Sequence, residues 1–209
     1  MIKVLVADDH AVVRRGLRQI LAETSDILVG GEASTAAELW QLVERERWDS
    51  VILDIEMPGR SGLELLGELK RQHPKLPVLI LTVYSEEQYA VRAIRAGASG
   101  FLTKESAPNQ LVAAVRKIAS GGRFITPELA ERLASSLAGD SDALPHEALS
   151  DREFQVLCMI ASGKTVSQIG QELSLSVKTI STHRTRILAK MNMKSNSELT
   201  HYAIKSRLV

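Results

Sequence analysis

Short apolar runs alternate with longer amphipathic stretches over the first 120 residues. Each apolar run is bounded by charged residues, Gly or Pro, as expected for strands that are buried on both faces of a parallel sheet. The predicted strands are Ile2–Ala7, Ile27–Gly31, Val51–Leu53, Val78–Leu81 and Gly100–Leu102. The predicted helices between and after them are Ala11–Ala22, Ala36–Glu46, Gly62–Gln72, Glu87–Ala96 and Pro108–Ser120. Five strands that alternate with five helices predict right-handed crossovers and an α/β fold with a doubly wound, five-stranded parallel sheet.

The pattern changes after the glycines at positions 121 and 122. Pro127–Leu137 has helical spacing, and Thr126 is placed to cap its first turn. Ala138–Leu149 is rich in Gly, Asp, Ser and Pro without periodicity, which predicts a linker. From Ser150 onward we find only short helical patterns and no strand pattern. We therefore predict an α/β domain over residues 1–121, a helix and linker over 122–146, and a small all-α domain over 147–209.

Composition and charge narrow the function classes. No apolar run in the 209 residues is long enough to span a bilayer, and acidic residues occur within the first ten positions, unlike in a secretory signal. A single cysteine, Cys158, agrees with a reducing compartment, so we expect a cytoplasmic protein without membrane contact. Residues 150–209 carry 9 Lys and Arg against 4 Asp and Glu. This basic segment fits either an anionic partner such as nucleic acid or an ordinary solvated face.

Chemistry-bearing residues follow four of the predicted strands. Asp8 and Asp9 follow the first, Asp54 the third, Thr82 the fourth and Lys104 the fifth. In a sheet of order 2-1-3-4-5 these side chains meet around one crevice at the carboxyl ends of the strands, where such sheets bind ligands. Any one of these aspartates could be a helix cap or turn residue, and for Asp9 alone that interpretation would be favoured. The whole set is better explained as one site.

Three carboxylates in one crevice repel one another, and a hard divalent cation relieves that repulsion. Mg²⁺ suits the site because it needs few carboxylates and keeps waters that a phosphoryl group can replace. Asp is a known covalent acceptor of phosphoryl groups. Thr82 and Lys104 can hold the phosphoryl oxygens. The residues themselves therefore predict a metal-dependent phosphoryl site.

Residues 2–121 resemble the receiver domain of bacterial response regulators, through the Asp8-Asp9 pair, the motif Asp54-x-x-Met57-Pro58-Gly59, Thr82 and Lys104. The resemblance implies that Asp54 accepts a phosphoryl group from a sensor histidine kinase. It further implies that Asp9 binds Mg²⁺ directly, Asp8 partly through water, and Glu56 through its backbone carbonyl. Thr82 and Phe101 match the pair of residues that reorients on phosphorylation. Glu56 and Tyr84 stand where side chains control access of water to the phosphoryl group.

One position departs from the receiver pattern. Many receivers have Pro after the Lys, commonly with a cis peptide bond, whereas this chain has Glu105. Without Pro a cis bond costs roughly 3 kcal/mol, so the cis geometry is in doubt here.

The last 60 residues have the pattern of a helix-turn-helix. Ser150 and Glu153 have the spacing of a capping box, and Gly163 ends the helix that follows. A second helix is predicted over Thr165–Leu173 and a third over Val177–Met191. The apolar side of the third helix consists of Ile180, His183, Ile187 and Met191. Its opposite face carries no carboxylate, as a helix that enters the major groove requires.

Residues 147–209 resemble the LuxR-type helix-turn-helix, through Leu149-Ser150-x-Arg152-Glu153, Gln168-Ile169, Leu173-x-Leu175-Ser176, Lys178-Thr179-Ile180 and His183. The DNA-binding residues that this implies are Lys178, Ser181, Thr182, Thr185 and Arg186. Family members often carry Lys where Ser181 and Thr185 stand. The last predicted helix, Ser197–Ser206, offers a seam for a homodimer formed by Leu199, Tyr202 and Ala203. A receiver followed by this domain is the NarL/FixJ architecture, which implies a transcription regulator that binds double-stranded DNA under the control of phosphorylation.

Two other functions compete with this interpretation. A phosphatase with Asp54 as nucleophile would need a second Asp two residues later, where this chain has Glu56, and no cap domain is evident. An atypical receiver that never accepts phosphate would normally lack part of the acidic set, which this chain keeps in full. We therefore predict a non-enzymatic regulator.

Overall fold

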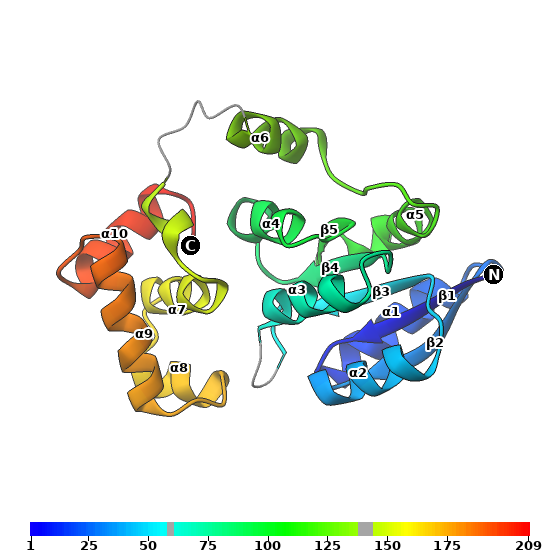
Figure 1. Ribbon diagram of the computed structural model, residues 1–209, viewed down its shortest axis with the longest axis horizontal. Helices are drawn as coiled ribbons and strands as arrows, with labels where there is room; N and C mark the ends of the chain where they lie inside the picture. The colour runs from blue at the N-terminus through cyan, green and yellow to red at the C-terminus, as the bar shows by residue number, and fades with distance from the viewer. Residues whose placement is uncertain (58–60, 138–143) are drawn as a thin grey trace. The chain divides into compact units, whose positions relative to one another are not determined.

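The computed structural model describes residues 1–57, 61–137 and 144–209. The chain divides into two units, Met1–Ala130 and Glu131–Val209 (Figure 1). Pro58 and Gly59 of the predicted motif, and positions 138–143 of the predicted linker, lie outside the described residues. Within the described ranges no helix is both long and apolar enough to cross a membrane.

The first unit contains one parallel sheet of five strands in the order β2-β1-β3-β4-β5. The strands are β1 (Ile2–Ala7), β2 (Ile27–Ala33), β3 (Ser50–Asp54), β4 (Val78–Thr82) and β5 (Gly100–Thr103). The fold class and the strand order that the apolar runs predicted are therefore confirmed. Four of the strands extend beyond the predicted runs by one or two residues.

Helices cover both faces of the sheet (Figure 1). They are α1 (Ala11–Ala22), α2 (Ala36–Arg45), α3 (Gly62–Gln72), α4 (Glu86–Arg95) and α5 (Ala107–Ala119). The helices α1 and α5 pack together over one face, and their core consists of Val4, Val6, Leu17, Leu21, Ile52, Leu79, Leu81, Leu111, Ala114, Val115 and Ile118. Val4 and Val6 on β1, like Leu79 and Leu81 on β4, are two residues apart, as the alternation of side chains along a strand requires.

The register of the strands brings the polar strand ends together. Ala7 pairs with Leu53, so the next residues along, Asp8 and Asp54, are neighbours at the carboxyl edge of the sheet. On the other side of β3, Thr82 pairs with Thr103 at the ends of β4 and β5. The site is thus a direct result of parallel pairing with all strands ending at one edge.

The segment after α5 returns to the sheet, which the sequence pattern did not predict. Phe124 forms a parallel bridge beside Gly100 at the outer edge of β5. The Phe124 N–H donates to the Ser99 carbonyl at 2.9 Å, and the Phe101 N–H donates to the Phe124 carbonyl at 3.3 Å. These bonds satisfy backbone groups that an open edge strand would leave unpaired.

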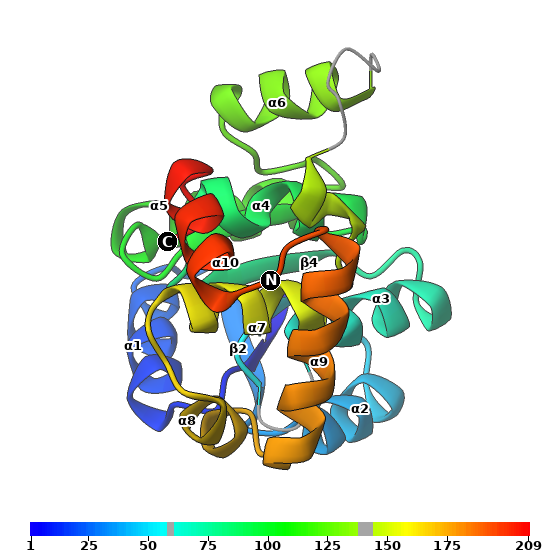
Figure 2. The same ribbon diagram turned by 90° about the vertical axis from the view of Figure 1, so that its left-hand side faces the viewer.

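The described part of the second unit contains helices and no strand (Figure 2). The helix α6 (Pro127–Leu137) spans the division between the two units. It is followed by the 3₁₀ helix η1 (Pro145–Ala148) and by α7 (Asp151–Ala161), α8 (Val166–Glu172), α9 (Val177–Lys190) and α10 (Asn196–Lys205). The helices α9 and α10 both pack against α7. The predicted capping box is confirmed, because the Ser150 hydroxyl accepts from the Glu153 N–H and the Glu153 carboxylate accepts from the Ser150 N–H.

The end of the predicted linker contains the 3₁₀ helix η1, Pro145–Ala148. His146 of this segment contacts the helices that follow it. Its Nδ1 lies 2.7 Å from the Tyr202 hydroxyl, and its ring centroid lies 5.7 Å from that of Phe154. A segment without apolar periodicity is thus attached to the helical unit through one aromatic side chain.

Candidate functional site

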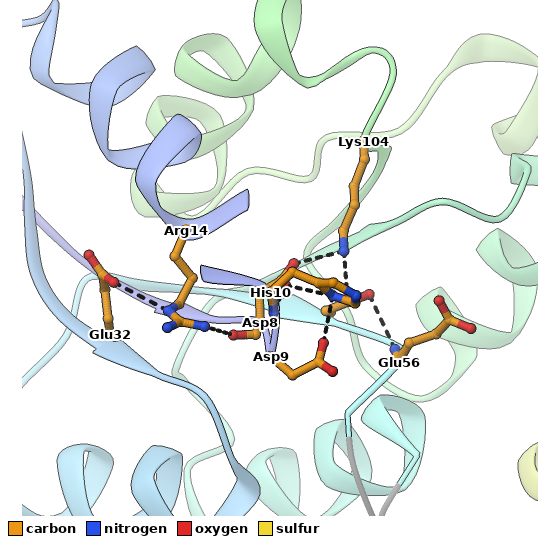
Figure 3. Close-up of polar contacts among 8 residues, drawn as sticks. Asp8, Asp9, His10, Arg14, Glu32, Glu56 and Lys104 are labelled. Carbon is orange, nitrogen blue, oxygen red and sulfur yellow. Dashed lines mark hydrogen bonds and ion pairs between the residues drawn. The ribbon is translucent and has the colours of Figure 1, made fainter. Parts of the chain in front are cut away.

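The acidic cluster forms at the carboxyl edge of the sheet, and Lys104 lies at its centre. Asp8 and Asp54 are each 1% exposed. The Lys104 ammonium lies 2.7 Å from Asp54 Oδ2 and 2.8 Å from Asp8 Oδ2, so one cation pairs with two carboxylates (Figure 3). The short turn after β5 places this lysine, whose backbone N–H donates to the Thr82 carbonyl at 2.7 Å.

Burial and charge act against each other at these residues. The pKa of Asp54 is raised to about 7, mainly by burial and to a smaller extent by the Asp8 carboxylate, while the Lys104 ammonium opposes the shift. Burial alone would lower the pKa of Lys104, but Asp54 and Asp8 hold it above its ordinary value. The lysine is therefore charged at neutral pH, and together with the Glu56 N–H it favours the ionised form of Asp54.

His10 joins the cluster, although the sequence interpretation did not include it. Its Nδ1 lies 2.7 Å from Asp9 Oδ1 and 3.4 Å from Asp8 Oδ1. Its backbone N–H donates to Asp8 Oδ1 at 2.8 Å. Ligand atoms of Asp8, Asp9, His10 and Asp54 all lie within 4.8 Å of one another. The available signal was its position directly after the Asp8-Asp9 pair.

Arg14 anchors the turn that carries these aspartates. Its Nη1 donates to the Asp8 carbonyl at 2.6 Å, and its Nε lies 3.3 Å from Glu32 Oε2 on β2 (Figure 3). Since Arg14 is one turn into α1, it connects helix, strand and loop. We did not predict this role, because an arginine on an amphipathic helix usually faces solvent.

The residues around Asp54 are connected by hydrogen bonds. The Glu56 N–H donates to Asp54 Oδ1 at 3.2 Å, and the Glu56 carboxylate accepts from the Tyr84 hydroxyl at 2.5 Å. The Tyr84 ring also stacks on Tyr89, with centroids 4.6 Å apart. The Thr82 hydroxyl, which is completely buried, accepts from the Tyr84 N–H at 3.3 Å. Tyr84 and Glu56 therefore form a bridge between the loops that follow β3 and β4.

Two further observations concern the receiver-like residues. Phe101 is 4% exposed, so its ring lies inside the unit in this conformation. The described chain has no cis peptide bond, so the bond between Lys104 and Glu105 is trans.

Gly62 is a second residue that the sequence interpretation missed. Its N–H donates to the Ile55 carbonyl at 2.8 Å. A Cβ atom at this position would lie 2.1 Å from the Asp54 carbonyl oxygen and 2.6 Å from the Ile55 Cα. The first turn of α3 can approach the end of β3 this closely only because the residue has no side chain.

The helix α9 presents a polar and basic face. Ile180 and Ile187 are completely buried and Met191 is 5% exposed, which confirms the predicted apolar side; His183 is half-buried. The predicted DNA-binding residues are all exposed, namely Lys178, Ser181, Thr182, Thr185 and Arg186. The Ser176 hydroxyl caps the helix by accepting from the Thr179 N–H at 3.1 Å.

Comparison with known families agrees with both halves of this arrangement. Residues 4–116 match the model of the response regulator receiver domain. Residues 147–203 match the model of bacterial regulatory proteins of the luxR family. The chain belongs to the NarL/FixJ family of response regulators. The family consists of DNA-binding transcription regulators and not of enzymes, which removes the phosphatase alternative.

Individual response regulators are similar over the whole chain. UvrY of Escherichia coli (strain K12) is 37% identical over 209 residues, which cover 100% of this chain and 96% of UvrY. GacA of Pseudomonas aeruginosa is 37% identical over 210 residues, which cover 100% of this chain and 98% of GacA. A solved structure of RcsB from Salmonella enterica serovar Typhimurium, bound to promoter P1flhDC in the presence of the phosphomimetic BeF3⁻, is 27% identical with a TM-score of 0.60. It covers 99% of this chain and 98% of the RcsB chain.

The site of this response regulator fits the divalent cation that its family implies. Asp8, Asp9 and Asp54 each offer a carboxylate oxygen within the same small volume. Hard oxygen ligands of this kind are those that Mg²⁺ prefers. Receiver domains typically bind Mg²⁺ through an acidic cluster of this kind.

The predicted dimer seam of this response regulator requires correction. Leu199 and Ala203 are completely buried and belong to the side of α10 that packs on α7 of the same chain. Tyr202 is bonded to His146. These three residues therefore contribute to packing within the helical unit, and Ile204 on another side of α10 is 61% exposed.

Proposed function

We propose that Asp54 accepts a phosphoryl group from a sensor histidine kinase with Mg²⁺, and that phosphorylation promotes dimerisation and DNA binding through α9. The proposed place of action is the cytoplasm. The observation that carries the proposal is the buried Asp54 carboxylate, held between Asp8 and Lys104 at the edge of the sheet.

The geometry supports phosphoryl transfer to Asp54. A carboxylate oxygen of Asp54 would form the new O–P bond while the bond between phosphorus and the kinase histidine breaks. Mg²⁺, held by Asp8, Asp9, Asp54 and the Glu56 carbonyl, would supply positive charge at the phosphoryl oxygens. Lys104 and the Thr82 hydroxyl would bind those phosphoryl oxygens. Lys104 would then give up its ion pairs with the carboxylates, and the Thr82 hydroxyl its hydrogen bond with the backbone.

The similarity to RcsB supports DNA binding as the response to phosphorylation. That protein was solved on promoter DNA with a phosphomimetic group. In this chain the exposed face of α9 carries the residues that would contact DNA, as described above. A dimer would contact two half-sites about one helical turn apart, and so would bind more tightly than a monomer.

Asp54→Asn tests the proposal. Incubation with acetyl phosphate and Mg²⁺ should add one phosphoryl group to the wild-type protein by intact mass and none to the variant, because an amide is not a nucleophile. Sedimentation of the same samples should show dimers for the phosphorylated wild type alone. A stable adduct on the variant would contradict the assignment of Asp54, and an unmodified wild type would favour an atypical receiver.

Tyr84→Ala should speed dephosphorylation several-fold, because the Tyr84 ring, which stacks on Tyr89, would cover the approach of water to the phosphoryl group. Tyr84→Phe is the matched control, since it keeps the ring and loses only the hydroxyl. We expect decay close to that of the wild type for Phe, measured by intact mass after donor removal. Equal decay of all three proteins would eliminate a shielding role.

Lys178→Ala should weaken binding to every DNA sequence and reduce the slope of log affinity against log salt by about one unit, as expected for one lost phosphate contact. Lys75→Ala removes the same charge from an exposed loop of the receiver unit and serves as control. Binding would be followed by fluorescence anisotropy over a series of salt concentrations. A Lys178 variant with changed base preference and an unchanged slope would contradict the phosphate role.

A further inference from the structure

Two threonines on the exposed face of α9 use their hydroxyl groups within their own helix. Thr182 Oγ1 donates to the Lys178 carbonyl at 3.0 Å, and Thr185 Oγ1 donates to the Ser181 carbonyl at 3.0 Å. Threonine in a helix commonly donates to the carbonyl four residues earlier. The hydroxyl therefore takes the branch at Cβ that lies against the backbone, and the other branch, the γ-methyl group, is directed away from the backbone.

This arrangement changes what the helix offers to a base pair. The single hydroxyl proton of each threonine is already donated, so neither side chain has a proton for guanine N7 and O6 or for thymine O4. A methyl group remains, and the thymine C5-methyl is the apolar group that the major groove displays. Val177, the first residue of α9, is a further apolar side chain and is 48% exposed.

We propose that α9 recognises thymine through the γ-methyl groups of Thr182 and Thr185, which pack against thymine C5-methyl groups in each half-site. The inference rests on the proposed DNA contact by this helix and adds the base that it selects. Burial of one methyl group stabilises by roughly 0.8 kcal/mol, which corresponds to about fourfold in affinity for each contact.

The first experiment needs only the wild-type protein. A preferred DNA sequence is selected with the full-length phosphorylated chain from a random pool. Each thymine of the half-site is then replaced singly by deoxyuridine, which lacks the C5-methyl and keeps every hydrogen-bonding group. Affinity should fall about fourfold at one or more thymines of the half-site and stay unchanged at thymines outside it.

Two substitutions at each position separate the methyl group from the hydroxyl. Thr→Val keeps a methyl group in place and removes the hydroxyl, whereas Thr→Ser removes the methyl group and keeps the hydroxyl. Thr182→Val and Thr185→Val should keep the preference for thymine over uracil. Thr182→Ser and Thr185→Ser should each lose the preference for thymine over uracil at one position of the half-site. Their affinity for the DNA with uracil at that position should be about that of the wild-type protein. Thermal unfolding of each variant checks that the helical unit is intact.

Several results would overturn the inference. They are equal binding of thymine and uracil DNA by the wild type, selected half-sites without thymine, or Val variants that lose the preference while Ser variants keep it. The last result would indicate that the hydroxyls turn toward the bases. Each of these leaves DNA binding itself intact, whereas a phosphorylated wild type that binds no DNA sequence would overturn the proposed function together with the inference.

Discussion

Lys104→Met is expected to destabilise the receiver unit by about 3 kcal/mol in the absence of divalent cations and to abolish phosphorylation of Asp54. The ammonium pairs with both Asp8 and Asp54, and these carboxylates are almost completely buried. Removal of one partner of a buried ion pair leaves uncompensated charge, which typically costs 3–5 kcal/mol. We expect a cost at the low end of this range because the Lys104 side chain is partly exposed to solvent.

The pH range of this effect follows from the pKa of Lys104, which is raised above the value in the unfolded chain. A raised pKa means that the charged lysine contributes its full stabilisation below the unfolded value. The contribution disappears only as the pH rises through the folded value, in the alkaline range. Lys104 is therefore charged at pH 7, and the difference between wild type and variant should shrink as the pH falls below about 7, where Asp54 becomes protonated.

Urea unfolding followed by circular dichroism would measure the effect at neutral pH with a metal chelator present. Lys70→Met is the matched control, because the Lys70 ammonium is also partly buried but donates to the Leu76 carbonyl at 2.7 Å and has no ion pair with a carboxylate among the residues that the structure describes. Its loss should cost about 1 kcal/mol. Addition of Asp8→Asn to Lys104→Met should restore part of the stability by removing one of two like charges. Equal losses for the two lysines would contradict the central role of Lys104.

Gly62→Ala is expected to destabilise the receiver unit by about 3 kcal/mol and to slow phosphorylation of Asp54. The added Cβ would meet the Asp54 carbonyl oxygen and the Ile55 Cα at distances that real structures do not contain. Both atoms belong to the backbone, so no side chain can rotate to make room. The end of β3 or the start of α3 would have to move, and either shift displaces the phosphoacceptor.

Gly67→Ala lies in the same helix and is the matched control. Nothing lies within 4 Å of its Cβ position, and Ala is favoured over Gly in a helix by about 1 kcal/mol, so this variant should be slightly more stable. Unfolding curves and the rate of phosphorylation by acetyl phosphate would be compared for both variants. Similar stability and similar rates for the two would show that the contact between α3 and β3 is unimportant.

The sequence by itself determined the elements of the first unit, their order in the sheet and the residue types at the strand ends. Buried strands, amphipathic helices and caps leave short-range patterns, because side-chain periodicity and capping depend on residues a few positions apart. The boundaries of α1, α3 and α6 and the capping box at Ser150 were predicted in this way and agree with the structure. Parallel pairing with all strands ending at one edge then brings Asp8 and Asp54 together.

Tertiary structure alone decided which groups these residues contact. The apolar side of α10 was visible in the sequence, but only the fold shows that Leu199 and Ala203 pack on α7 of the same chain and not on a second copy. His146, Phe124 and Gly62 act through partners at least seven positions away, such as Tyr202, Gly100 and Asp54, respectively. Such contacts leave no periodic signal, because the distance between two segments depends on the packing of the elements that carry them.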